Sequence, residues 1–187
     1  MREGEEIKIV FTGPMGSGKT TAIAAISDAI PVSTEVENLD RDSVDKHNTT
    51  VGLDFGQVAL EDGQVLRLYG TPGQVRFDFM WRIIGEGALG VVLLLDATQV
   101  TTLADLDVFL DAYGELVRRQ QVVVAVGRTT APGAIAVADV ARRIALRKKV
   151  LPVFSVDVRR REDVLLLIDA LLNLIEASAD QEEPNET

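Results

Sequence analysis

Cysteine is absent from this 187-residue chain. Its absence excludes disulfides, thiolate metal sites, prenylation and palmitoylation. Apolar runs of membrane-spanning length are also missing, and the Met-Arg-Glu-Gly start matches neither a signal peptide nor a myristoylation site. We therefore expect a soluble, cytoplasmic protein with no membrane anchor.

Positive charge is scarce: 19 Lys and Arg stand against 29 Asp and Glu, for a net charge of −10. Such a chain is repelled by nucleic acid and by anionic lipid, so we expect neither as a partner. The basic residues between 142 and 149 are the local exception, and we interpret them as the solvated end of a helix.

Apolar residues make up 47% of the chain, which argues against disorder and is enough for one sizeable core. We expect a single domain over residues 7–178. A short extension precedes it over residues 1–6, and a polar, flexible tail follows over residues 179–187.

The most specific pattern is G-x-x-x-x-G-K-T, which reads GPMGSGKT over residues 13–20. It follows an apolar run at Ile7–Phe11 and precedes a helix-like segment at Thr21–Ile30. A strand, a glycine-rich loop and a helix in this order predict a phosphate-binding loop.

The residue types in this loop suit anionic oxygens. Its glycines let successive backbone N–H groups point into one concavity, and the start of the helix adds a positive dipole end. Lys19 supplies a full charge for the outer phosphates, and the Thr20 hydroxyl is placed to ligate Mg²⁺. We predict that a nucleotide contacts Gly13, Pro14, Met15, Gly16, Ser17, Gly18, Lys19, Thr20 and Thr21.

Strand-like and helix-like segments alternate along the rest of the chain, and an Asp-Gly turn predicts one antiparallel hairpin. This alternation predicts an α/β fold, a doubly wound and mostly parallel sheet of six strands with one antiparallel edge strand. The expected strands are Ile7–Thr12, Val51–Leu60, Gln64–Tyr69, Ala88–Leu95, Gln121–Val126 and Val150–Val156. The expected helices are Thr20–Ile30, Val75–Ile84, Leu103–Val117, Val137–Lys148 and Glu162–Ala177.

The order of parts is similar to that of small GTPases: phosphate loop, long polar loop, hairpin, then P-G-Q. The stretches that carry the resemblance are STEVENLD (33–40), NTTVGLDFG (48–56), LYGTPGQVRFDFMW (68–81) and GALGVVLLLDAT (87–98). The chain resembles Arf-like members of the Ras/Arf superfamily and bacterial relatives such as the gliding-motility and "ATP/GTP-binding protein" families. This resemblance implies a P-loop NTPase with the three-layer α/β/α small G-protein fold, which binds GTP or GDP with Mg²⁺.

The resemblance also implies roles for two loops. Residues 32–50 would be switch I, in which Thr50 ligates Mg²⁺ and senses the γ-phosphate. In switch II the Gly73 N–H would meet the γ-phosphate, and Gln74 would orient the attacking water as the catalytic residue. On pattern alone, Thr50 also fits an ordinary strand start and Gln74 an ordinary loop residue.

A protein partner is the remaining implication, namely a roadblock-type regulator that contacts residues 32–50 and 70–85. The apolar segment Val75–Ile84 suits either such a partner or packing on the sheet.

Two departures from the small-GTPase pattern affect hydrolysis. Gly70 stands where small GTPases carry an aspartate that holds Mg²⁺ through water, so the protein ligands are chiefly Thr20 and Thr50, with Asp54 or Asp40 as candidate helpers. Met15 is bulky where glycine admits a partner's arginine finger, so we expect slow hydrolysis. Arg41 and Lys46 are candidate replacements for that finger within the chain.

A third departure affects the base. The N-K-x-D motif, whose carboxylate accepts both N–H groups of guanine, is replaced by Gly127-Arg128-Thr129-Thr130. Selectivity for guanine should be lost with that acceptor. The second base-contacting segment would be Ser155, Val156 and Asp157, with Asp157 as a partial substitute and Arg128 as a group that stacks on the base.

Three functions fit these observations. The first is a nucleotide-dependent switch that hydrolyses slowly, and the second is a non-catalytic pseudo-GTPase that serves as an interaction module. The third is an ATPase or small-molecule kinase, which the lack of an arginine-rich lid disfavours.

Overall fold

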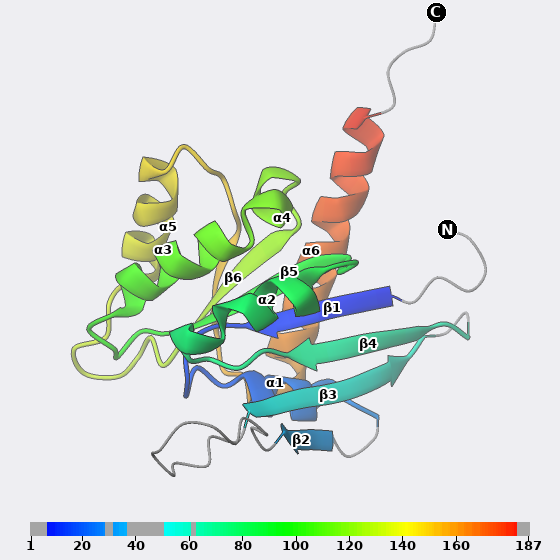
Figure 1. Cartoon of the computed structure of the whole chain (residues 1–187). Coiled ribbons are helices and arrows are strands. Elements are labelled where there is room, and N and C mark those ends of the chain that lie inside the picture. Colours follow the sequence, from blue (N-terminus) through cyan, green and yellow to red (C-terminus); the bar gives the residue numbers. More distant parts are fainter. Residues whose placement is uncertain (1–6, 29–31, 37–50, 61–62, 183–187) are drawn as a thin grey trace, which may run out of the picture.

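Figure 1 shows the computed structural model, which describes residues 7–28, 32–36, 51–60 and 63–182. Strands and helices alternate along the chain. The strands are β1 (Ile7–Thr12), β2 (Val32–Val36), β3 (Val51–Ala59), β4 (Val65–Gly70), β5 (Gly90–Asp96), β6 (Val122–Gly127) and β7 (Val153–Val156). The helices are α1 (Lys19–Ile26), the 3₁₀ turn η1 (Val75–Phe77), α2 (Asp78–Gly85), α3 (Thr102–Ala112), α4 (Gly114–Arg118), α5 (Val137–Leu146) and α6 (Arg161–Glu182).

These strands form one sheet in the order β2-β3-β4-β1-β5-β6-β7. The pairs from β4 through β1, β5 and β6 to β7 are parallel, and β3 runs antiparallel to both of its neighbours. The mostly parallel α/β fold and its hairpin are therefore confirmed.

The sheet has one strand more than we expected. Val32–Val36, predicted as part of a polar loop, pairs with β3 as β2, so the antiparallel strand lies next to the edge and not at it. The backbone groups on the outer side of β3 need hydrogen-bond partners, and this short segment supplies them.

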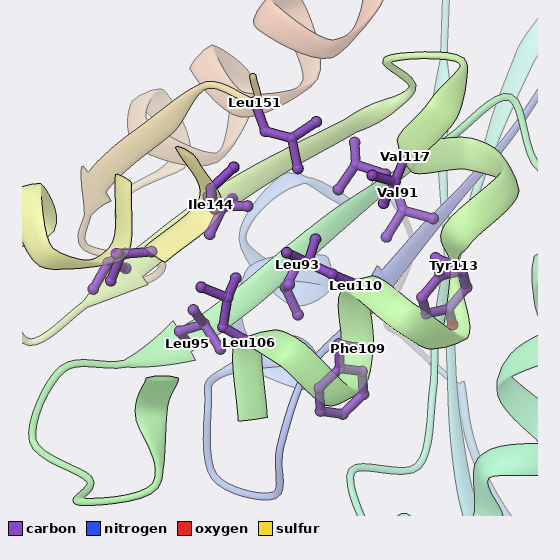
Figure 2. Packing of buried hydrophobic residues seen from close by; sticks show 14 of the residues in the cluster. Val91, Leu93, Leu95, Leu106, Phe109, Leu110, Tyr113, Val117, Ile144 and Leu151 are labelled. Carbon is purple, nitrogen blue, oxygen red and sulfur yellow. The ribbon is translucent and has the colours of Figure 1, made fainter. Parts of the chain in front are cut away.

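Helices cover both faces of the sheet, which makes three layers. Helices α1 and α6 lie on one face, and α2, α3 and α5 lie on the other (Figure 1). Strand β5 is buried along its whole length, as a central parallel strand should be. Its alternate residues Val91, Leu93 and Leu95 pack toward α3, beside Leu106 and Leu110 (Figure 2).

Several predicted boundaries were wrong by a few residues. The helix expected over Leu103–Val117 is broken at Tyr113, just before Gly114, into α3 and α4. Helix α6 continues to Glu182, four residues into the segment that we expected to be a tail. Within the part of the chain that the structure describes, no helix combines the length and the apolar character needed to cross a bilayer.

Candidate nucleotide site

The phosphate loop connects the end of β1 to the start of α1, at the carboxyl edge of the parallel sheet. Its first glycine, Gly13, has a φ of +138°, and a Cβ built on it would lie 2.0 Å from the carbonyl oxygen of Leu94. No side chain fits there, so this glycine lets the backbone bend against the neighbouring strand. Ligands in open α/β sheets bind at this edge, and the unpaired N–H groups of the first turn of α1 face it.

Lys19 is the charged group of this loop. Its Nζ donates to the carbonyl oxygens of Gly13 and Pro14, both at 2.8 Å, and the residue is only 8% exposed. Burial lowers the pKa of Lys19 to about 8, and the negative charge of Asp54 acts in the opposite direction. The ammonium therefore lies inside the loop, where an anionic ligand would favour its charged form.

Thr20 begins the face of α1 that approaches strand β3. Its Oγ1 donates to Oδ2 of Asp54 at 2.5 Å, and Asp54 is only 8% exposed. A hydroxyl and a carboxylate are the oxygen donors that Mg²⁺ prefers. Three or more His, Asp or Glu side chains do not gather anywhere within the described residues, so these donors fit an ion that is held mainly by phosphate and water.

The segment after β4 lies directly against the phosphate loop. A Cβ built on Gly73 would lie 2.4 Å from the backbone nitrogen of Met15, which means that the two backbones touch. Gln74 is half-buried, and its Nε2 lies 3.7 Å from the Met15 sulfur. A hydrogen bond to the core holds this segment in place, because the buried Trp81 indole donates to the Pro72 carbonyl at 2.6 Å.

The structure thus brings Gly73 and Gln74 to the phosphate loop, and their roles toward a γ-phosphate and a water remain predictions. Thr50 lies outside the described residues, as do the other switch I candidates Asp40, Arg41 and Lys46.

A pocket of about 520 Å³ opens beside the phosphate loop. It contains the predicted base-contacting residues Arg128, Ser155, Val156 and Asp157. Its lining is formed by Ser17, Gly18, Thr21, Gly127, Arg128, Thr129, Thr130, Ala131, Ser155, Val156, Asp157, Val158 and Arg159.

Arg128 connects this pocket to the phosphate loop. Its guanidinium donates to the carbonyl oxygen of Gly16 at 3.3 Å and forms an ion pair with Asp96. Burial opposes the charged form of Asp96, but hydrogen bonds from Thr98 and the charge of Arg128 hold its pKa below the ordinary value. In this arrangement the guanidinium braces the loop, and its role as a stacking group remains a prediction.

Asp157, the predicted substitute for the guanine-binding carboxylate, is already paired. The Arg159 guanidinium donates to both of its oxygens, at 2.8 and 2.6 Å. These hydrogen bonds lower the pKa of Asp157 to about 2. Its backbone N–H donates to Oδ2 of Asp163 at 2.8 Å. The carboxylate that lines the pocket is therefore ion-paired with a neighbouring cation.

Residues of this site that sequence reasoning did not assign include Asp96, Val158 and Arg159. Asp96 ends a buried parallel strand, and the rule that ligands bind beyond strand ends would have found it. No sequence signal points to Val158 or Arg159, because only the folded loop brings them to the pocket.

No protein-family model matches the chain. Over 101 residues, 54% of its length, the chain is 30% identical to "Uncharacterized protein MJ1339" of Methanocaldococcus jannaschii, and the match covers 58% of that protein. Over 103 residues it is 32% identical to "Ras-related protein Rab-32C" of Dictyostelium discoideum, and this match covers 41% of that protein. The chain thus spans about half the length of the curated relatives it matches.

Together with the fold, the partial match to a Rab supports a relationship to Ras-like small GTPases. Guanine nucleotide and Mg²⁺ are the ligands that such a relationship implies in general.

Proposed function

We propose that this chain is a nucleotide-dependent molecular switch that binds GTP and GDP with Mg²⁺ and hydrolyses GTP slowly. One observation carries the proposal, the contact between the Gly73 backbone and the phosphate loop at Met15. A γ-phosphate at the rim of that loop would lie beside Gly73 and Gln74, whereas a diphosphate would end short of them. The two nucleotides would therefore favour different positions of this segment, which is what a switch requires.

Slow hydrolysis follows from the residues around the loop. Gln74 lies beside the loop, which supports a role in orienting a water, and Mg²⁺ would supply charge neutralisation between the phosphates when bound. Met15 is 74% exposed at the mouth of the loop, where its side chain obstructs a partner's arginine finger.

Base selectivity should be weak. The pocket presents hydroxyls and guanidinium groups, and the carboxylate of Asp157 is paired with Arg159. Because Arg159 engages the Asp157 carboxylate, this carboxylate should accept the two N–H groups of guanine less well, so other triphosphates should also bind.

The partner surface that we propose combines residues 32–50 with residues 70–85. In the second segment Phe77 and Trp81 are buried, whereas Val75, Phe79 and Ile83 are 60%, 56% and 62% exposed. Phe79 and Ile83 lie four residues apart and so share one face of α2, and Val75 precedes them in η1. An apolar stripe on the segment that touches the phosphate loop suits a partner that senses the bound nucleotide.

By resemblance to the bacterial gliding-motility and "ATP/GTP-binding protein" families, we propose a roadblock-type regulator as this partner and bacterial signalling or polarity as the process. Pull-down of a roadblock-type protein by the GTP-loaded chain, and not by the Phe79→Asp chain, would support this partner.

Calorimetry with GDP, GTP, ADP and ATP in Mg²⁺ tests the switch directly. We expect saturable binding of GDP and GTP and weak, Mg²⁺-dependent release of phosphate from GTP. Failure to bind any of the four nucleotides would overturn the proposal.

A non-catalytic interaction module is the second candidate, and the glycine at position 70 favours it because the usual Mg²⁺-holding aspartate is missing there. Turnover separates the two functions. Phosphate release that Gln74→Ala abolishes and the exposed control Gln57→Ala preserves supports the switch. Bound GTP that survives for days in the presence of the partner supports the module.

A further inference from the structure

Gly70 and Asp54 are direct neighbours across two strands. The register of β3 and β4 pairs them, and a Cβ built on Gly70 would lie 2.9 Å from the Asp54 Cβ and 3.0 Å from its Oδ2. The Asp54 carboxylate therefore occupies the space into which a side chain at position 70 would extend. The two positions cannot both carry a carboxylate without a clash.

Asp54 also reaches the residue that we predict to ligate Mg²⁺. Its Oδ2 accepts a hydrogen bond from the Thr20 hydroxyl at 2.5 Å. A hydroxyl has one O–H and two lone pairs, so a Thr20 oxygen that donates its O–H to Asp54 keeps its lone pairs for a cation. A hydrogen bond of this kind, on the side of the Thr20 oxygen away from the ion, fixes the orientation of a metal ligand.

We propose that Asp54 is the positioning residue of the Mg²⁺ site and replaces the aspartate that small GTPases carry at the position of Gly70. It holds Thr20 in its ligating orientation and accepts hydrogen bonds from water on the ion, which Mg²⁺ retains when it binds phosphates. The carboxylate thus stands on β3 at position 54 and not on β4 at position 70, and the glycine at position 70 leaves room for it. This inference rests on the proposed function, because Mg²⁺ enters with the nucleotide.

A purely structural role for Asp54 is the competing explanation. Asp54 is buried and close enough to Lys19 for its charge to favour the ammonium. In that case Asp54 would stabilise the loop equally with and without Mg²⁺. A comparison of the two conditions separates the roles.

The experiment measures the release rate of a fluorescent GDP from the full chain in Mg²⁺ and in EDTA. We expect Mg²⁺ to slow release from the unmodified protein about 10- to 100-fold. Asp54→Asn should lose most of this ratio. Any effect of the lost charge on Lys19 acts in Mg²⁺ and in EDTA alike, so it changes both release rates but not their ratio. Asp28→Asn is the matched control, because Asp28 also contacts β3, through the Ala59 N–H at 2.7 Å, but lies away from the phosphate loop.

The exchange Asp54→Gly with Gly70→Asp should restore the Mg²⁺ effect, since it returns a carboxylate to the neighbouring strand without the clash. A second readout, Mn²⁺ binding to the GDP complex followed by electron paramagnetic resonance, should show the same loss and rescue.

A full Mg²⁺ effect in Asp54→Asn, or a folded double variant without rescue, would overturn the inference. Equal release from the unmodified protein in Mg²⁺ and EDTA would also overturn it while leaving nucleotide binding intact. A protein that binds no nucleotide in either condition refutes the proposed function itself.

Discussion

At the phosphate end of the site the charged groups are buried and turned toward the loop, whereas at the base end they are exposed and paired with one another. Lys19 and Asp54 are each 8% exposed and act on the loop and on Thr20. In contrast, the Arg159 side chain is 79% exposed and forms an ion pair with Asp157. The charged groups of the phosphate end are arranged around the loop, whereas those of the base end form an ion pair with each other.

This difference between the two ends shows that phosphate binding and base selection depend on the sequence in different ways. Phosphate binding relies on backbone N–H groups and one buried cation, which the loop spacing provides as a unit. Base selection needs an unpaired acceptor at one position, so a few substitutions remove it and leave the fold intact. Variants at each end should therefore affect affinity and selectivity separately.

The largest effect should come from Lys19→Ala. Removing a buried cation that faces the phosphates should weaken GDP binding by roughly 100-fold or more, because charge-assisted hydrogen bonds are lost. Calorimetry measures the affinity, and Lys149→Ala, a lysine outside the site, should leave it unchanged. An equal small loss in both variants would contradict this description of the phosphate end.

At the base end, Gly127→Asn combined with Thr130→Asp should create guanine selectivity. A Cβ at position 127 meets nothing closer than 3.7 Å, so the backbone there has room for a side chain to begin. The new carboxylate can accept both guanine N–H groups, and the preference for GDP over ADP should rise roughly 10- to 100-fold. The matched control is Gly127→Asn with Thr130→Asn, which has the same shape but no carboxylate and should show little change in the ratio of the two dissociation constants.

A pH series probes the phosphate end without mutation. The pKa of Lys19 is about 8 because of burial, so the free protein loses the ammonium above that pH. Phosphate favours the charged form, so binding raises this pKa and takes up a proton. GDP affinity should be level below about pH 7 and about tenfold weaker at pH 9.

Calorimetry in two buffers with different heats of ionisation measures the proton uptake. The Lys19→Ala protein should show neither the uptake nor the pH dependence. A flat affinity from pH 7 to pH 9 in the unmodified protein would contradict the predicted role of Lys19.

The smallest effect should follow Arg159→Ala. Freeing Asp157 raises its pKa from about 2 toward the ordinary value, which a carboxyl NMR titration detects. Because the ion pair is exposed, the change in GDP affinity should not exceed about fivefold. A loss as large as that of Lys19→Ala would mean that Arg159 itself contacts the nucleotide.

Local patterns predicted much of this structure. The spacing of GPMGSGKT placed the loop between β1 and α1, and the Asp-Gly turn predicted the β3–β4 hairpin. Both depend on neighbouring residues alone. The α/β class followed from the alternation of the segments.

What the sequence left open depends on contacts between distant residues. Asp54 was one of two candidate helpers, and only the pairing of β3 with β4 places it beside Gly70 and Thr20. Strand β2 has too few apolar residues to be recognised without its partner β3. The pairing of Asp157 with Arg159 requires the folded loop after β7, so this ion pair could not be predicted.

The central claim is that affinity resides in the phosphate end and that the base end does not select. Competition calorimetry with GDP, ADP and guanosine in Mg²⁺ tests it most directly. We predict that GDP and ADP bind within about tenfold of each other, because no free carboxylate reads the base, and that guanosine does not bind measurably. A preference for GDP of about 1,000-fold, or guanosine binding comparable to that of GDP, would contradict it.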